Sequence, residues 1–317
     1  MSEYVLNMFP AKESERAEFE ALMPHAVWEY PRRSTVTREQ LERATVIMGT
    51  PRPEDLVHAK NLRWLQSLWM GVDEYVAEGV LPETVTITAC AGAYRQSVSE
   101  HMLATLLAMC RNLPQVRDNQ RAHKWVDFKQ MRTIRGATVL VVGAGTIGGD
   151  FARLCKALGA NTVGLKRTVT GPIDGFDRLD TMDALDAWLP KADVVALIVP
   201  HTPETIHLMD RRRLSLMKPD AMLVSDGRGS VLDQDALADL MGQGHLWGAA
   251  LDVTVPEPLN ADSPLWDIPN LLLTPHLAGG IRLEVSRKNA VDFALANFRR
   301  YAQGQPLQAV ARSGLVR

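Results

Sequence analysis

The sequence predicts an α/β protein of two domains, each built on a mostly parallel sheet. Short apolar runs rich in β-branched residues alternate with segments whose apolar residues recur at helical spacing, the pattern of strands connected by helices. A chain of 317 residues with 46% hydrophobic residues is long enough to bury more than one core. A glycine-rich turn lies in mid-chain, between a strand-like run and a helix-like segment, and favours a doubly wound sheet there.

The first hundred residues are expected to hold strands followed by a long helix. The helix is placed from near Ser97 through Met109, because Ser97 and Glu100 have the spacing of a capping box, and it is interpreted as a bridge between domains. The expected strands are Tyr4–Leu6, Ala44–Met48, Trp64–Trp69 and Thr86–Ala89.

The second half of the chain repeats the alternation, and the helical pattern from Ile281 to Tyr301 is expected to return to the first domain. Parallel strands end at a common edge where ligands bind, so Arg228, Asp252 and His276, which follow or end strands, are candidate site residues. The expected strands are Ala137–Val142, Asn161–Leu165, Val194–Val199, Ala221–Ser225, Gly248–Asp252 and Leu271–Thr274.

The glycine turn predicts a dinucleotide-binding Rossmann unit. Gly143, Gly145 and Gly148 follow a strand and open a helix, with Thr146 and Ile147 between them. Glycines in this pattern allow a tight turn, a close approach to a pyrophosphate and close helix packing. The free N–H groups at the start of the helix would then hold the phosphates.

Composition excludes several classes of function. The net charge is −2, with acids and bases interspersed, so no nucleic-acid partner is expected. No signal segment or membrane-length apolar run is present, which favours the cytoplasm and no membrane partner. Cys90, Cys110 and Cys155 are interpreted as buried reduced thiols, and no metal site is expected because ligand spacing is lacking. His101 and His123 lie in helical stretches and are interpreted as structural or exposed.

Several segments together resemble the D-isomer-specific 2-hydroxyacid dehydrogenase family, glyoxylate/hydroxypyruvate reductases included. They are the glycine turn and residues 68–73, 199–205, 225–231, 248–259 and 274–280, which occur in the family's order over nearly the whole chain. The resemblance implies a Rossmann domain at 102–282, inserted into a flavodoxin-like substrate domain made of 1–101 and 283–317. It also implies catalysis between the domains and a homodimer, with Leu113 to Met131 as the dimer arm.

The resemblance further implies NAD(P)-dependent interconversion of a 2-keto acid and a D-2-hydroxy acid. His276 matches the acid/base, and Glu257 the carboxylate that orients it and favours its protonated form. Arg228 matches the arginine that binds the substrate carboxylate and polarises the carbonyl. Substrate contacts are expected from Met70, Gly71, Val72 and Arg228. Asp252 matches a residue at the nicotinamide, and the other expected cofactor contacts are Val199, Pro200, Thr205, Asp226, His276 and Ala278.

The end of the second Rossmann strand favours NADP(H), with NAD(H) possible. NAD-preferring domains usually place an acid there for the ribose 2′-hydroxyl, whereas this chain has Lys166, Arg167 and Thr168. The two cations suit a 2′-phosphate, and in the resembled family arginine at this place accompanies NADP preference. The other interpretation is a solvated edge.

Some residues depart from the family pattern, and other functions stay open. Asp226 puts an acid beside the cofactor loop, and His201 replaces a common leucine. Glu257 argues against the formate dehydrogenase branch, where glutamine stands. A nucleotide-sensing corepressor-like binding protein on the same fold, or a bare nucleotide-binding scaffold, is the alternative. Tyr94 and Arg95 are candidates for favouring an acidic or hydroxylated substrate, with a plain surface loop as the other interpretation.

Overall fold

The computed structural model describes residues 3–312, which form two compact units. One unit runs from Arg95 to Gly279, and the other combines the residues up to Tyr94 with those from Gly280 onward. The second unit is therefore discontinuous in sequence. The division lies a few residues before the positions expected from the sequence, after 101 and after 282.

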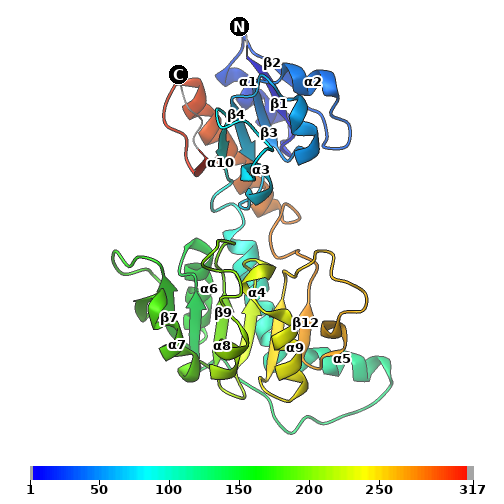
Figure 1. Ribbon diagram of the computed structural model, residues 1–317, viewed down its shortest axis with the longest axis vertical. Helices are drawn as coiled ribbons and strands as arrows, with labels where there is room; N and C mark the ends of the chain where they lie inside the picture. The colour runs from blue at the N-terminus through cyan, green and yellow to red at the C-terminus, as the bar shows by residue number, and fades with distance from the viewer. Residues whose placement is uncertain (1–2, 313–317) are drawn as a thin grey trace. The chain divides into compact units, whose positions relative to one another are not determined.

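The unit of residues 95–279 contains a seven-stranded sheet whose strands are all parallel (Figure 1). The strand order is β12-β11-β10-β9-β6-β7-β8, which reverses direction between β6 and β9 and makes the carboxyl ends of those strands the expected ligand crevice. The strands are β6 (Thr138–Val142), β7 (Asn161–Lys166), β8 (Arg178–Thr181), β9 (Val194–Leu197), β10 (Met222–Ser225), β11 (Gly248–Leu251) and β12 (Leu271–Leu273).

Helices cover both faces of this sheet. Helices α4 and α6 pack together on one face and α8 and α9 on the other. Strands β9, β10 and β11 are buried along their whole length, which explains their unbroken apolar sequences. The helices are α4 (Arg95–Cys110), α5 (Leu113–Arg121), α6 (Thr146–Ala157), α7 (Leu185–Trp188), α8 (Arg211–Leu216) and α9 (Gln234–Gly242), with 3₁₀ turns at Met182–Ala184, Leu189–Lys191, Gly229–Val231 and Pro264–Asp267.

The discontinuous unit has a six-stranded sheet in the order β13-β5-β4-β3-β1-β2. Strands β1 to β5 are parallel in the flavodoxin-like order, and β13 is antiparallel to β5. The strands are β1 (Tyr4–Asn7), β2 (Val27–Glu29), β3 (Val46–Gly49), β4 (Trp64–Ser67), β5 (Thr86–Thr88) and β13 (Val310–Arg312). The helices are α1 (Glu13–Leu22), α2 (Arg38–Arg43), α3 (Asp73–Val76) and α10 (Glu284–Ala302), with a 3₁₀ turn at Pro53–His58.

The predicted α/β fold class is confirmed, and two helix starts are corrected. Helix α4 begins at Arg95, so Ser97 lies inside its first turn and is no cap. Helix α10 begins at Glu284, a few residues after Ile281. The three strands that the sequence analysis did not predict are short and lie at or near sheet edges: β2, β8 and β13.

Candidate active site

His276 and Glu257 form a close pair in the loops that follow β12 and β11. The Nδ1 atom of His276 lies 2.8 Å from Oε2 of Glu257. The other carboxylate oxygen, Oε1, accepts the backbone N–H of Thr254 at 3.1 Å, which fixes the carboxylate at both ends. Both side chains keep substantial exposure, 50% for His276 and 39% for Glu257, so the ring remains accessible to a ligand.

Asp252 holds the loop that carries His276. Its buried carboxylate accepts the hydroxyl of Thr274 at 2.5 Å and the backbone N–H groups of Leu277 and Ala278 at 2.9 and 3.0 Å. The backbone N–H of His276 donates to the Asp252 carbonyl at 2.9 Å. These bonds fix the backbone on both sides of His276. The φ of His276 is +47°, which is unusual for a residue other than glycine. The Asp252 carboxylate therefore stabilises the loop of residues 274–278.

Arg228 lies on an adjoining loop, between β10 and α9. The glycines on either side let three loops approach closely, since a Cβ at Gly227 would lie 2.6 Å from the carbonyl oxygen of Val199. A Cβ at Gly229 would lie 2.4 Å from the backbone of Thr254, in the loop of Glu257. The Arg228 guanidinium donates to the Gly227 carbonyl at 2.8 Å. The arginine and the His276–Glu257 pair thus come from contiguous loops.

The glycine turn after β6 fits a dinucleotide. Gly143 has a φ of +108°, and a Cβ there would lie 2.3 Å from the carbonyl oxygen of Ile198, across the point where the strand order reverses. A Cβ at Gly148 would lie 2.3 Å from the Gly143 carbonyl oxygen, so α6 packs against the turn. At Gly145 a Cβ would meet nothing within 4 Å, which leaves open space before the first N–H groups of α6, at Thr146 and Ile147.

Comparisons with known proteins agree with this geometry. Residues 103–278 match the family model of the D-isomer specific 2-hydroxyacid dehydrogenase NAD-binding domain. The glyoxylate/hydroxypyruvate reductase B of Pectobacterium carotovorum is 32% identical over 227 residues, 70% of this chain and 71% of that protein. The chain belongs to the D-isomer-specific 2-hydroxyacid dehydrogenase family. As a member it is an NAD(P)-dependent oxidoreductase, as the sequence predicted.

Solved structures of the family superpose over almost the whole chain. A family protein from Aeromonas salmonicida is 30% identical with a TM-score of 0.86, covering 98% of this chain and 99% of that one. A dehydrogenase from Xanthobacter autotrophicus, solved with NADPH and MES, is 27% identical with a TM-score of 0.80 and covers 98% of each chain. The match to the D-3-phosphoglycerate dehydrogenase of Methanocaldococcus jannaschii, 29% identical over 84% of this chain, spans 51% of that longer protein.

In this dehydrogenase the residues Lys166, Arg167 and Thr168, here called the cationic segment, lie at the carboxyl end of β7. Lys166 ends the strand, and Arg167 and Thr168 are exposed after it. A hydrogen bond from Thr202 lowers the pKa of Glu204, and the positive charge of Arg167 lowers it further. Arg167 is thus near enough to the segment 200–205 to interact with its charge.

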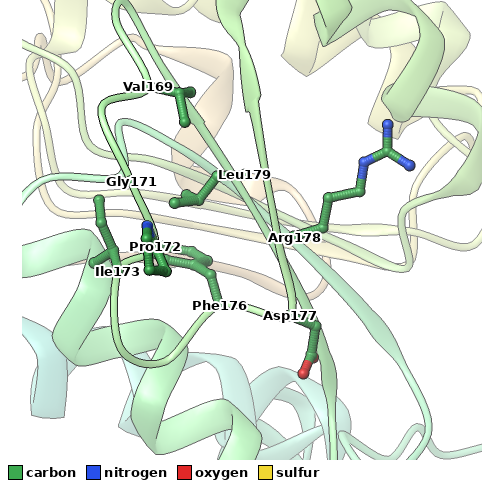
Figure 2. A pocket seen from close by; sticks show the side chains of 8 residues that line it. All are labelled: Val169, Gly171, Pro172, Ile173, Phe176, Asp177, Arg178 and Leu179. Carbon is green, nitrogen blue, oxygen red and sulfur yellow. The ribbon is translucent and has the colours of Figure 1, made fainter.

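A small apolar cavity follows the cationic segment (Figure 2). It measures about 160 Å³. Ile173, Phe176 and Leu179 supply its apolar wall, and Figure 2 shows the Arg178 side chain directed away from it. The first lining residue in sequence, Val169, directly follows Thr168, so the cavity is formed by the chain just after the cationic residues.

Several expected cofactor residues have structural duties. Val199 is buried, Pro200 is exposed, and Thr205 ties their loop because its hydroxyl donates to the Pro200 carbonyl at 2.6 Å. Ala278 is buried with its N–H bound to Asp252, so only its other atoms can meet a ligand. His201 contacts Ser230, with Nδ1 and Oγ 2.7 Å apart.

Asp226 is a half-buried acid that directly follows β10. Its backbone N–H donates to the Leu197 carbonyl at 3.1 Å, and its Oδ1 is enclosed without a hydrogen-bond partner within residues 3–312. Burial raises the pKa of the Asp226 carboxyl well above its usual range, and the charge of Asp252 adds to the effect. The side chain is therefore held toward its neutral form.

Met70, Gly71 and Val72 belong to the discontinuous unit, directly after β4 and Leu68. The backbone N–H groups of all three lack a hydrogen-bond acceptor within the described residues 3–312. Met70 is 53% exposed and Val72 is buried. Three consecutive free N–H groups suit an anionic oxygen.

His101, on α4, has the structural role that is one of the two interpretations from the sequence. Its Nε2 lies 3.1 Å from the Thr274 hydroxyl and 3.8 Å from Oδ1 of Asp252. It thus extends the network that holds the His276 loop. No local pattern could predict this contact, because 173 positions separate His101 from Thr274.

The described residues offer no metal cluster, and the three thiols are buried. Among residues 3–312 no group of three metal-ligating side chains occurs, and no helix there is long and apolar enough to cross a membrane. Cys90, Cys110 and Cys155 are free and buried, as expected. Burial raises their thiol pKa values to about 12, 11 and 12 respectively, which makes them poor nucleophiles.

Proposed function

We propose that this dehydrogenase reduces a 2-keto acid to a D-2-hydroxy acid, or catalyses the reverse, with NADPH preferred. The observation that carries the proposal is the His276–Glu257 pair at 2.8 Å, held in an accessible loop by Asp252. A histidine fixed at Nδ1 by a carboxylate leaves Nε2 to exchange a proton with substrate. The glyoxylate/hydroxypyruvate reductase B of Pectobacterium carotovorum, to which the chain is similar, supports the substrate class.

In this proposal each residue has one task. The cofactor, when bound, would supply the hydride for the carbonyl carbon. His276 donates a proton from Nε2 to the carbonyl oxygen, and Glu257 orients the ring through Nδ1. Arg228 binds the carboxylate and polarises the carbonyl, since a guanidinium offers two parallel N–H donors. The free N–H groups of Met70, Gly71 and Val72 receive the other carboxylate oxygen.

The cofactor would be held by the unit of residues 95–279, and the discontinuous unit would be the substrate domain. The pyrophosphate would lie before Gly145, Thr146 and Ile147, where the structure has open space and free N–H groups. Asp252 and Asp226 would face the nicotinamide end, together with the expected contacts at Val199, Pro200, Thr205, His276 and Ala278.

We propose the phosphorylated cofactor because Lys166, Arg167 and Thr168 replace the usual acid at the end of β7. The NADPH in the Xanthobacter structure is in keeping with this choice. The Arg167→Ala variant should lose NADPH efficiency by at least about tenfold and leave NADH efficiency nearly unchanged, as expected for loss of one charged phosphate contact. Arg178→Ala is the control. Arg178 lies on β8 opposite Val163 of β7, away from the carboxyl end of β7 where the 2′-phosphate would bind. Equal NADPH efficiency in wild type and Arg167→Ala would contradict the assignment.

The reaction itself is tested by a substrate scan. NADPH and NADH oxidation should be followed with glyoxylate, hydroxypyruvate, pyruvate and bulkier 2-keto acids, and the product analysed for chirality. The proposal expects turnover of at least one keto acid to a D product. Tight NADPH binding without turnover across the panel would contradict it and favour a nucleotide-sensing binding protein.

We further propose a cytoplasmic homodimer that uses α5 and the segment after it as an arm. Leu113, Val116 and Met131 are 40–50% exposed and Trp125 is fully exposed, an unusual concentration of apolar surface. Sedimentation should give a dimer for the wild type and a monomer for Trp125→Glu combined with Leu113→Glu. A monomeric wild type would contradict this assembly.

A further inference from the structure

The loop proposed to receive the substrate carboxylate is fixed by a buried tyrosine. Tyr94 is 6% exposed, and its hydroxyl donates to the carbonyl oxygen of Leu68 at 2.7 Å. Leu68 directly precedes the segment 69–72, whose last three N–H groups are free. The hydroxyl therefore donates to the backbone of the loop, and at 6% exposure Tyr94 is no plain surface-loop residue.

Further contacts hold the start of the same loop. The backbone N–H of Trp69 donates to Oγ of Ser67 at 3.0 Å, and the Trp69 carbonyl accepts the N–H of Cys90 at 2.9 Å. The indole of Trp69 packs against the Tyr94 ring with centroids 5.6 Å apart. Tyr94 thus contacts the loop through both its ring and its hydroxyl, immediately before the free N–H groups begin.

The far end of the loop is fixed separately. The Val72 carbonyl accepts the N–H of Tyr75 at 2.9 Å, within the first turn of α3. Between this anchor and Trp69, Met70 and Gly71 depend on the two ends for their orientation. The Leu68 end is the one fixed by a side chain, that of Tyr94. Without the Tyr94 hydroxyl, the Leu68 carbonyl would lack its buried donor and would rotate or hydrogen-bond to water.

We propose that Tyr94 is a positioning residue for the substrate carboxylate: its hydroxyl fixes the Leu68 carbonyl and so aims the N–H groups of Met70, Gly71 and Val72. The inference rests on the proposed function. Its neighbour Arg95 has a different duty, because its Nε pairs with Asp150 of α6 at 3.0 Å. Because Tyr94 acts through the loop that binds the carboxylate, its effect should be confined to substrates that carry a carboxylate.

The test compares wild type with Tyr94→Phe, using the best 2-keto acid of the scan and its methyl ester. The phenylalanine keeps the ring and removes the donor. KM for the keto acid should rise about tenfold with kcat changed less than about twofold, because the loop binds the carboxylate similarly in ground and transition states. KM for the ester and the dissociation constant for NADPH should not change.

Tyr75→Phe is the matched control. Tyr75 is also buried in this unit, and its hydroxyl donates to a backbone carbonyl, that of Pro51, at 2.9 Å. It should lose comparable thermal stability without changing the ratio of keto acid to ester efficiency. Equal losses for acid and ester in Tyr94→Phe, or an unchanged KM for the acid, would overturn the inference.

The role of Tyr94 and the proposed function fail in different ways. Absence of wild-type turnover contradicts the proposed function, whereas the comparison of variants within an active enzyme tests Tyr94 alone. If phenylalanine leaves the unit unfolded, position 94 is filled with 4-aminophenylalanine, which donates, and 4-methylphenylalanine, which does not. A low KM with the amino group and a high KM with the methyl group would support the inference, and equal KM values would overturn it.

Discussion

At the scale of single residues, the site depends on acids with different environments. Glu257 is partly exposed and paired with His276, and Asp252 is buried but surrounded by donors. Asp226 is enclosed without a partner for Oδ1 within the described residues, 3–312. A carboxylate oxygen enclosed without a donor is costly when the group is charged, so Asp226 should make the stability of the protein depend on pH.

The Asp226→Asn variant tests this dependence. Burial raises the pKa of Asp226 above its ordinary 3.8 in the folded state, so the stability it contributes is full below that value and falls as pH rises toward the folded pKa. The asparagine variant escapes this loss. Its melting temperature should exceed that of the cofactor-free wild type by a margin that grows from pH 5 to pH 8, about 2–4 °C for each kcal/mol.

The control is Asp262→Asn, at an exposed position in the same unit. It should track the wild type at every pH. Parallel melting curves for wild type and Asp226→Asn across this range would show that Asp226 is ionised at little cost and would refute the assignment.

At the scale of elements, two glycines of the same turn have different roles: Gly143 is needed for folding and Gly145 for cofactor binding. A Cβ at Gly143 would meet the Ile198 carbonyl at 2.3 Å, whereas one at Gly145 enters open space. Gly143→Ala should therefore destabilise the unit, by several kcal/mol as in other overpacked or strained positions. Gly145→Ala should melt like the wild type yet bind NADPH at least about tenfold more weakly, because the new methyl occupies the place of the pyrophosphate.

Calorimetry and fluorescence titration with NADPH distinguish the two glycine variants. Gly145→Ala that binds NADPH as tightly as the wild type would place the pyrophosphate elsewhere. A stable Gly143→Ala would show that β6 and β9 can separate at their carboxyl ends.

A buried ion pair joins α1 to α10, which are far apart in sequence. Arg287 donates through both terminal nitrogens to Glu15, at 2.7 and 3.0 Å, and each residue is 8% exposed. The hydrogen bond from Arg287 keeps the pKa of Glu15 below its ordinary 4.5. The pair thus anchors the returning helix to the start of the chain.

Glu15→Gln should destabilise the protein by up to about 3 kcal/mol, because it removes the buried one of the two carboxylates that pair with Arg287 and leaves only the exposed Glu284. The stability given by a depressed carboxyl pKa is present above 4.5 and lost as pH falls, so the gap between wild type and variant should narrow below about pH 4.5. Glu42→Gln, which removes an exposed pair with Arg38, should leave the stability nearly unchanged, because solvent screens exposed ion pairs. A constant gap from pH 7 to pH 3.5 would contradict this account.

The sequence predicted elements where local pattern and packing agree. The β6 run, the glycine turn and α6 were expected because burial on both faces imposes an apolar strand, and the turn imposes glycine. Strand β2 was missed because Val27–Glu29 is short and none of it is buried. The start of α4 was misplaced because Ser97 and Glu100 mimic a cap, while the helix begins two residues earlier.

At the scale of the whole molecule, the site joins residues that are distant in sequence. Chemistry-bearing residues such as His276 and Glu257 could be identified because their types and order resemble a family. The supporting contacts of His101 and Tyr94 could not, because hydrogen bonds between distant segments leave no local pattern. The contribution of Asp226 likewise required the structure, since only its enclosure distinguishes it from a surface acid.

The central claim is that His276 transfers the proton in keto acid reduction. The most direct measurement is kcat/KM for NADPH-dependent reduction of the best 2-keto acid by wild type and His276→Asn, with the NADPH dissociation constant measured in parallel. The account predicts a loss of about 10²–10⁴-fold in kcat/KM with cofactor affinity nearly unchanged. A His276→Asn variant that keeps within a few-fold of wild-type kcat/KM would contradict it.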